Sequence, residues 1–427
     1  MGEGLVRRWC VMTTADVADP APSAAAVQFL GSEADYWRLR IKGAALLMVT
    51  LGLYRFWFAT DVRRFLWSNT EIGGETLEYT GLATELLGGF LLALAILVPL
   101  YTAVAGAALA LDTAEQLIGM LTFLLLIMLG QFALYRARRY RLTRTVFRGV
   151  RFEQHGAAWR YALFALFWWG IVIVTLGLAY PWQRASLERY KMHRTSYGDL
   201  AGAFEGSGWA LFLRGAPIWL LVIGPILLGL VALAVTVDWN ALNGAMATGG
   251  KPVAVGNAGA RAAGIIGVAF GVSALAIVLL YPLFQAIMMR WWISGLRFGP
   301  VSITSRLRSG KVYRIYLRFL LYIALYIIAL AIVGVLAALL GRAIIGADHG
   351  SVSAELLGTT VTLVLYVVTM LGASTIYQVV VSFAMWRLGA QTAELSGAEA
   401  LNAVRATGSA SSALGEGLAD ALGVGGI

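Results

Sequence analysis

Long apolar stretches separated by short polar segments dominate the chain. Six of them contain no charged residue and are roughly 20 residues or longer, enough to cross about 30 Å of hydrocarbon as a helix. They cover residues 86–111, 117–135, 215–237, 263–289, 319–340 and 357–383. This pattern predicts six transmembrane helices.

Two further apolar segments, 43–53 and 161–182, are ambiguous. The first is too short to cross a bilayer alone, and segments of about 10 to 14 residues are typically re-entrant or interfacial. The second is long enough to cross but is flanked by basic segments. The same Thr-Leu-Gly-Leu sequence occurs in both segments, at Thr50–Leu53 and Thr175–Leu178, so we expect equivalent structures.

The distribution of the 33 Lys and Arg residues favours six crossings over eight. With six crossings, 30 basic residues lie on one face of the membrane, and Lys251, Arg261 and Arg342 lie on the other. If both ambiguous segments also crossed, the division would be 19 to 14. Cytoplasmic loops carry the excess of Lys and Arg. We therefore expect both termini to be cytoplasmic and both ambiguous segments to lie in the cytoplasmic leaflet.

An arginine beside an aromatic residue recurs where apolar segments end. The copies are Arg63-Arg64-Phe65, Arg138-Arg139-Tyr140, Arg189-Tyr190, Arg290-Trp291-Trp292 and the eroded Met385-Trp386-Arg387. Aromatic rings favour the membrane interface, and a guanidinium can reach lipid phosphate from there. The motif indicates internal repeats whose helix ends lie at the headgroup level.

Each motif is followed by a segment with glycine turns. Residues 70–79 alternate polar and apolar side chains around Gly73 and Gly74, which predicts a short β-hairpin. Isolated hairpins are marginally stable, so these would have to pack together or on the helix ends.

Composition agrees with a membrane protein, since 59% of the residues are hydrophobic and only 13% are charged. We predict an all-α polytopic membrane protein with about six full transmembrane helices and two re-entrant or interfacial segments. Short cytoplasmic juxtamembrane β-hairpins and internal repeats complete the predicted fold class. The expected divisions are a flexible cytoplasmic segment 1–35, a repeat-built transmembrane domain 36–387, and an Ala/Gly/Ser-rich tail 388–427.

The motifs resemble those of the YjgN-like family, a domain-of-unknown-function family of bacterial inner-membrane proteins. The resemblance rests on Thr50–Trp57, on Arg63–Thr70, and on the glycine pair followed by Glu78-Tyr79-Thr80-Gly81. It covers residues 29–387, although Gly299-Pro300 replaces the glycine pair in the fourth copy. The resemblance implies an inner-membrane location and a polytopic architecture, but no catalytic or binding residues.

Candidate chemistry is sparse. The chain has one cysteine, Cys10, and its histidines, His155, His193 and His349, show no paired metal-ligand spacing. The six spans lack the Asp, Glu, His or Lys that usually marks an ion-coupled transporter. We expect no metal and no cofactor, and enzyme activity has no support in the sequence. The net charge of +10 is explained by positive-inside bias rather than by binding of nucleic acid.

Two functional hypotheses follow. The first is a non-catalytic membrane scaffold or envelope factor whose basic cytoplasmic face contacts anionic lipid or a protein partner. The alternative is a permease or channel for a small solute or lipid, in which Pro99, Pro217 and Pro225 could break helices around a site. The candidate anionic-lipid contacts are Arg63, Arg64, Arg138, Arg139, Arg189 and Arg290. The same arginines could instead serve only as membrane anchors.

Overall fold

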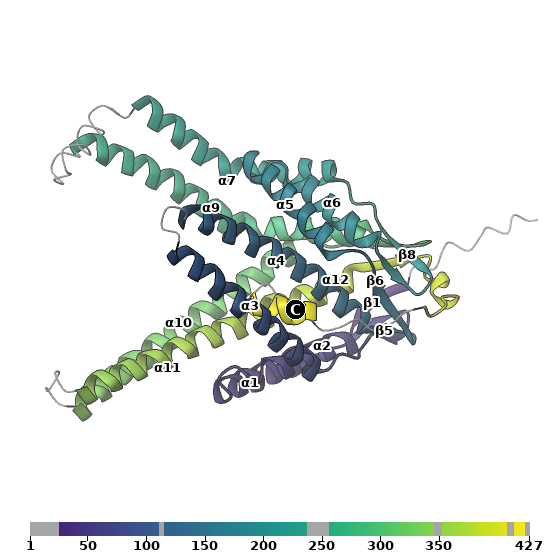
Figure 1. Cartoon of the computed structure of the whole chain (residues 1–427), viewed down its shortest axis with the longest axis horizontal. Coiled ribbons are helices and arrows are strands. Elements are labelled where there is room, and N and C mark those ends of the chain that lie inside the picture. Colours follow the sequence, from purple (N-terminus) through teal and green to yellow (C-terminus); the bar gives the residue numbers. More distant parts are fainter. Residues whose placement is uncertain (1–24, 111–114, 237–255, 346–351, 408–413, 423–427) are drawn as a thin grey trace, which may run out of the picture.

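The computed structural model describes residues 25–110, 115–236, 256–345, 352–407 and 414–422, and shows long helices at one end and a sheet at the other (Figure 1). Residues 1–24 of the predicted N-terminal segment, together with Cys10, Lys251 and His349, lie outside the described residues.

Among the described residues, six helices are long and apolar enough to cross a membrane, and they coincide with the six apolar stretches of the sequence. They are α3 (Ala83–Ala110), α4 (Glu115–Thr143), α7 (Gly208–Thr236), α9 (Gly256–Gly295), α10 (Ser309–Ile345) and α11 (Val352–Tyr377). The last helix continues through a π-helix, η3 (Gln378–Phe383), into α12 (Ala384–Thr392). Pro99, Pro217 and Pro225 lie inside α3 and α7, which continue through them.

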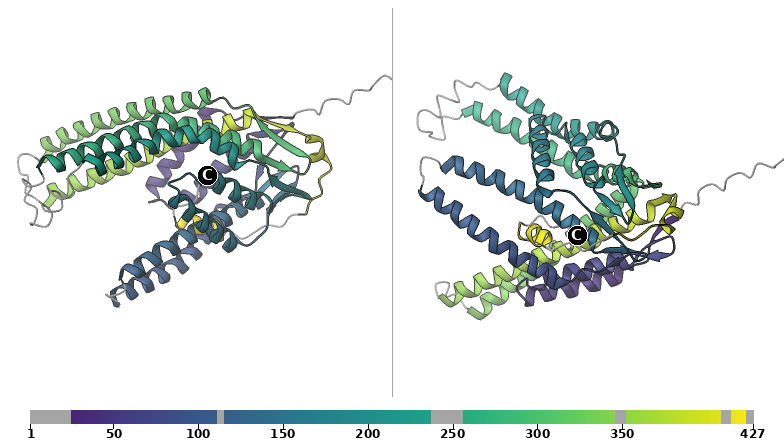
Figure 2. Two further views of the ribbon diagram at one scale, coloured as in Figure 1. Left: turned by 90° about the horizontal axis from the view of Figure 1, so that it is seen from above. Right: turned by 45° about the vertical axis from the view of Figure 1, so that its right-hand side comes forward.

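The long helices form three hairpins that spread apart as they leave the sheet (Figures 1 and 2). The pairs are α3 with α4, α7 with α9, and α10 with α11. In the most hydrophobic windows of Gly208–Thr236 and Ser309–Gly341, no residue is buried inside the chain. The three hairpins are therefore not one solid bundle, and their apolar faces are left for surrounding lipid or other protein.

Two short helical hairpins precede the first and the second long hairpin along the chain. They consist of α1 (Glu33–Val49) with α2 (Arg55–Ser68), and α5 (Ala158–Val174) with α6 (Tyr180–Met192). A helix of 17 residues, such as α1 or α5, extends about 25 Å. Each hairpin turns at the shared Thr-Leu-Gly-Leu sequence.

The two Thr-Leu-Gly-Leu turns have the same geometry. In each, the threonine hydroxyl donates to the carbonyl four residues earlier and accepts from the amide four residues later. The leucine that follows lies at positive φ, 50° for Leu51 and 49° for Leu176. The similar sequences thus fold into equivalent structures, as the pattern predicts.

All strands within the described residues belong to one antiparallel sheet. They are β1 (Ala25–Phe29), β2 (Thr70–Ile72), β3 (Glu75–Thr76), β4 (Glu78–Tyr79), β5 (Thr145–Phe147), β6 (Val150–Gln154), β7 (Thr195–Tyr197), β8 (Leu200–Phe204), β9 (Leu296–Phe298), β10 (Val301–Ser305) and β11 (Ala393–Ser396). The order is β3-β2-β1-β11-β10-β9-β8-β7-β6-β5-β4. The strands at its two ends, β3 and β4, are separated only by Leu77, so the sheet closes on itself.

Closure depends on both ends of the described chain. Strand β1, from the segment 1–35, pairs with β2 and also with β11, from the tail 388–427, so that Ala25 lies opposite Leu395. Strand β6 pairs with β7 in the same sheet. The α5–α6 hairpin between them therefore leaves and re-enters the sheet at adjacent strands, and α1–α2 does the same between β1 and β2.

Four of the strand pairs are joined by two-residue turns, at 73–74, 148–149, 198–199 and 299–300. Each turn contains a glycine at positive φ, a conformation that glycine adopts without the steric cost of a Cβ. Gly198 also needs the space, because an added Cβ would lie 2.3 Å from the carbonyl oxygen of Arg405.

The segment after β11 covers the turns and contributes to the core of the sheet. A 3-10 helix, η4 (Ala398–Asn402), places Asn402 next to Arg148, and Asp199 accepts a hydrogen bond from the amide of Arg405. Leu401 joins two apolar clusters, one around Phe147, Val150 and Tyr197, the other around Val27, Val301 and Leu395. The closed sheet is therefore filled with side chains.

A last helix, α13 (Leu414–Ala421), returns to the long helices and packs on α3 and α4. Its Ala419 contacts a cluster of small residues that includes Ala93 and Ala133. Small side chains of this kind let helix backbones approach closely.

Candidate functional site

Five helices that lead into the sheet end in the same way. They are α2 before β2, α4 before β5, α6 before β7, α9 before β9 and α12 before β11. An arginine lies six residues before the first residue of the strand in all five cases: Arg64, Arg139, Arg189, Arg290 and Arg387. In four of them a threonine at the helix end donates its hydroxyl to the carbonyl four residues earlier, which closes the last turn: Thr70, Thr145, Thr195 and Thr392. Arg387 is not among the six residues singled out from the sequence, although its spacing from β11 identifies it.

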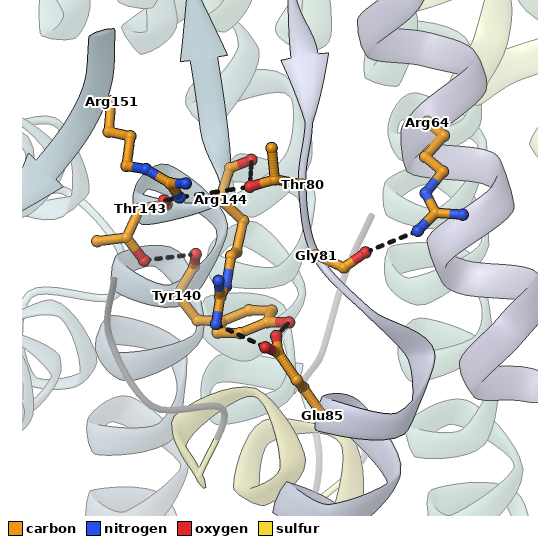
Figure 3. Close-up of polar contacts among 8 residues, drawn as sticks. All are labelled: Arg64, Thr80, Gly81, Glu85, Tyr140, Thr143, Arg144 and Arg151. Atoms are coloured by element: carbon orange, nitrogen blue, oxygen red, sulfur yellow. Dashed lines mark hydrogen bonds and ion pairs between the residues drawn. The ribbon is translucent and has the colours of Figure 1, made fainter. Parts of the chain in front are cut away.

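Three of these arginines tie the end of one helix to the start of the next. Arg64 donates to the carbonyl of Gly81 at 3.2 Å (Figure 3), and Arg189 donates to the carbonyl of Gly206 at 3.1 Å. In both cases the acceptor is 17 residues further on. Arg290 donates to the hydroxyl of Ser309 at 3.3 Å. Arg64 and Arg189 remain exposed, so their charged groups can also contact a ligand at the surface.

Two of the predicted lipid contacts have partners inside the protein. Arg63 is only 4% exposed and donates to the hydroxyl of Tyr79 at 3.1 Å. Arg138 forms an ion pair with Glu188 at 3.4 Å. Arg139 is half-buried. The six predicted residues are distributed over four helix ends rather than gathered in one site.

A polar junction fastens the start of α3 to the end of α4 (Figure 3). Glu85 accepts hydrogen bonds from Tyr140 and from Arg144, both at 2.7 Å. Arg151, on β6, donates to the carbonyl of Thr143 at 3.2 Å. These contacts fix the long hairpin on the sheet and leave no charge of Glu85 uncompensated.

A buried ionic cluster lies between α4 and α6. Glu188 contacts Lys191 at 2.5 Å and Arg138 at 3.4 Å, and Trp292 donates its indole N–H to it at 3.3 Å. Burial alone would raise the pKa of Glu188, but Lys191 and Arg138 lower it below its usual value. Burial lowers the pKa of Lys191 to about 8, although Glu188 opposes that change. The charges are satisfied internally, as buried ion pairs require.

A basic cavity of about 320 Å³ lies where α1, α10, η3 and α12 meet. Its polar lining is Lys311, Arg314 and Arg318 from α10, Arg387 and Gln391 from α12, and Glu33 from α1. Its apolar lining is Ile315, Val380, Phe383, Ala384 and Leu388. Arg318 pairs with both carboxylate oxygens of Glu33, at 2.5 and 3.0 Å.

The other three cations of this cavity differ from those of the buried cluster. Within the described part of the chain, no carboxylate lies within ion-pair distance of Lys311, Arg314 or Arg387. The three basic residues of α10 were not singled out from the sequence, although their spacing of three and four residues places them on one helix face.

Metal chemistry has no support in the part of the chain that the structure describes, where no group of three His, Cys, Asp or Glu residues could hold an ion. Of the described histidines, His155 lies 3.1 Å from Glu153.

Comparison with known families gives a match over most of the chain. The model of a family described as "Bacterial protein of unknown function (DUF898)" matches residues 24–421. No curated protein and no solved structure matches the chain.

Proposed function

The chain belongs to the bacterial DUF898 family, the YjgN family that its motifs indicate, and on this premise we propose that it is a non-catalytic scaffold of the inner membrane. In this role anionic lipid headgroups are held by its basic cytoplasmic rim, the repeated arginines Arg64, Arg139, Arg189, Arg290 and Arg387. The observation that carries the proposal is the recurrence of one arginine at all five helix ends next to the sheet.

The proposed topology has six crossings, with the sheet and both termini in the cytoplasm. It is supported by the closed sheet, because the helical hairpins all leave and re-enter it and so begin and end on one side of the membrane. The segments joined to the sheet carry most of the basic residues, as cytoplasmic segments do.

The two short hairpins are re-entrant in this proposal. Their second helices, α2 and α6, carry several charges each, among them Asp61 and Arg64 in α2 and Arg184 and Arg189 in α6. Charged side chains are costly at the centre of a bilayer, which favours a position at the cytoplasmic interface.

We also propose that the chain contains five copies of one repeat, each a helix end followed by two adjacent strands. The fifth copy is divided, since β11 supplies its first strand and β1 its second. The sequence Phe29-Leu30-Gly31-Ser32 at the end of β1 matches Phe204-Glu205-Gly206-Ser207 at the end of β8 in three of four positions, which supports this assignment.

Two observations favour a scaffold over a permease. The prolines of α3 and α7 lie in continuous helices, so they do not create the broken helices that line transporter sites. The cavity between α7 and α9 is mainly apolar, with Leu228, Val268 and Val272 in its lining. An apolar cavity of this kind is suited to contact with acyl chains.

The proposal is tested with the full chain in nanodiscs of phosphatidylcholine alone or mixed with phosphatidylglycerol. Anionic lipid should raise the thermal unfolding midpoint by several degrees at low salt, and the gain should shrink as salt screens the charges. The double variant Arg64→Gln/Arg189→Gln should lose most of that gain. Arg405→Gln removes a charge at the far end of the sheet and serves as the control. An equal gain in the double variant and in the wild type would refute the proposal.

A further inference from the structure

We infer that the basic cavity between α1, α10, η3 and α12 is a specific site for a phosphate-bearing amphiphile, with an anionic phospholipid as the expected occupant. The inference rests on the proposed contact with anionic lipid, and it adds a defined pocket to a general basic rim.

The cavity has an excess of positive charge. Lys311, Arg314 and Arg318 follow one face of α10, and Arg387 lines the same cavity from α12. Glu33 supplies one negative charge, and it is already paired with Arg318. Like charges held together repel one another unless a counter-charge lies between them. Arginine and lysine are also the side chains that proteins use to bind phosphate.

The level of the cavity relative to the membrane also favours a lipid as its occupant. The apolar run of α10 begins at Phe319, directly after Arg318. One turn further along, Tyr322 stacks on Trp37 of α1, with ring centroids 6.3 Å apart. Tyrosine and tryptophan are enriched at the level of the headgroups. The cationic part of the cavity therefore lies where lipid phosphates lie.

The apolar wall of the cavity favours a lipid over a free anion. Ile315 comes from the same helix face as the cations, whereas Val380 and Phe383 come from the π-helix η3. Short π-helical segments occur frequently at functional sites. The wall is also fixed in position, because Phe383 is buried and stacks on Tyr36 with centroids 4.6 Å apart. A headgroup with an attached acyl chain can use both halves of such a cavity, while inorganic phosphate can use only the cations.

Replacement of Glu33 should tighten ligand binding, an effect that a purely structural role of Glu33 would not produce. An anion that enters the cavity faces this carboxylate, which also occupies Arg318. Glu33→Gln removes the repulsion and frees the guanidinium, so it should tighten binding. Arg314→Gln/Arg387→Gln should weaken it.

The test is native mass spectrometry of the full chain in detergent, titrated with phosphatidylglycerol and, separately, with inorganic phosphate. We expect one phosphatidylglycerol to bind more tightly than the rest. Arg314→Gln/Arg387→Gln should weaken that first binding step at least tenfold, Glu33→Gln should strengthen it, and Arg405→Gln should leave it unchanged. Millimolar inorganic phosphate should not displace the lipid.

The outcomes separate the pocket from the general rim. If Arg64→Gln/Arg189→Gln weakens the later binding steps and the pocket variants change nothing, the pocket is refuted and the proposed function stands. If inorganic phosphate displaces the lipid and binds alone with equal affinity, the site is one for free anions and the lipid assignment is overturned. If Glu33→Gln does not tighten binding, the site is refuted even where the double pocket variant fails to fold.

Discussion

Two clusters of cations at the ends of the helices differ in what neutralises them. Arg138 and Lys191 surround the buried carboxylate of Glu188, whereas Lys311 and Arg314 line an open cavity and have no carboxylate within ion-pair distance among the described residues. Both clusters look alike in sequence, as basic residues next to apolar segments. Burial and counter-charge, rather than residue type, therefore separate cations that stabilise the fold from cations available to a ligand.

The largest effect on stability is expected from Glu188→Ala. The change leaves Arg138 and Lys191 without their shared partner in a buried position, which typically costs about 3–5 kcal/mol. The free energy of unfolding can be measured by titration with dodecyl sulfate in mild detergent. Glu33→Ala is the matched control, because its pair with Arg318 is partly exposed and should cost no more than about 1 kcal/mol. Equal losses in the two variants would contradict the distinction.

A smaller loss is expected from Arg63→Ala. Its guanidinium is buried and donates to Tyr79, so removal leaves a buried hydroxyl without this partner, at a cost of about 1–3 kcal/mol. The neighbouring exposed Arg64 provides the comparison in the same assay. Arg64→Gln should cost about 1 kcal/mol, the contribution of one hydrogen bond to Gly81. A larger loss for Arg64→Gln than for Arg63→Ala would show that the exposed arginine carries the structural role.

The pH dependence of the buried cluster comes next in size. Because the pKa of Lys191 is lowered to about 8, the unfolded chain binds more protons than the folded one between pH 8 and the ordinary lysine value. The contribution of Lys191 to the free energy of unfolding should thus rise with pH in that window, by on the order of 1 kcal/mol from pH 8 to pH 9. Lys191→Met should lack this rise. An identical pH profile in variant and wild type would argue against burial of the charge.

The smallest effect is expected from Arg314→Gln in detergent without added lipid. Its side chain is exposed and has no carboxylate within ion-pair distance among the described residues, so the change should be within about 0.5 kcal/mol. The same titration measures it. A loss above 2 kcal/mol would make Arg314 a structural cation like Arg138.

The long apolar runs allow the six spans to be predicted, because about 20 uncharged residues have few alternatives to a membrane helix. The closed sheet is not predictable in the same way. Its strands have only two to five residues, and β1 pairs with β11 from the opposite end of the described chain. Short strands carry little periodicity of their own, and distant pairing leaves no local signal.

The site is predictable only in part. The arginines next to aromatic residues are visible as a repeat, but sequence does not reveal that Arg63 turns inward to Tyr79 while Arg64 remains exposed. The cavity is lined by Glu33, Arg314 and Arg387, three residues brought together from α1, α10 and α12. The helical spacing of Lys311, Arg314 and Arg318 could have suggested part of it.

The composition of the lipid that stays bound to the purified protein measures the role of the basic rim. The full chain, extracted from its membrane in mild detergent and purified, should retain anionic phospholipid in clear excess over the proportion in the bulk membrane. A variant with Arg64, Arg189, Arg314 and Arg387 all replaced by glutamine should retain little of that excess, while Arg405→Gln should keep it. Retained lipid of the same composition as the bulk membrane in the wild-type chain would contradict the proposed role of the basic rim.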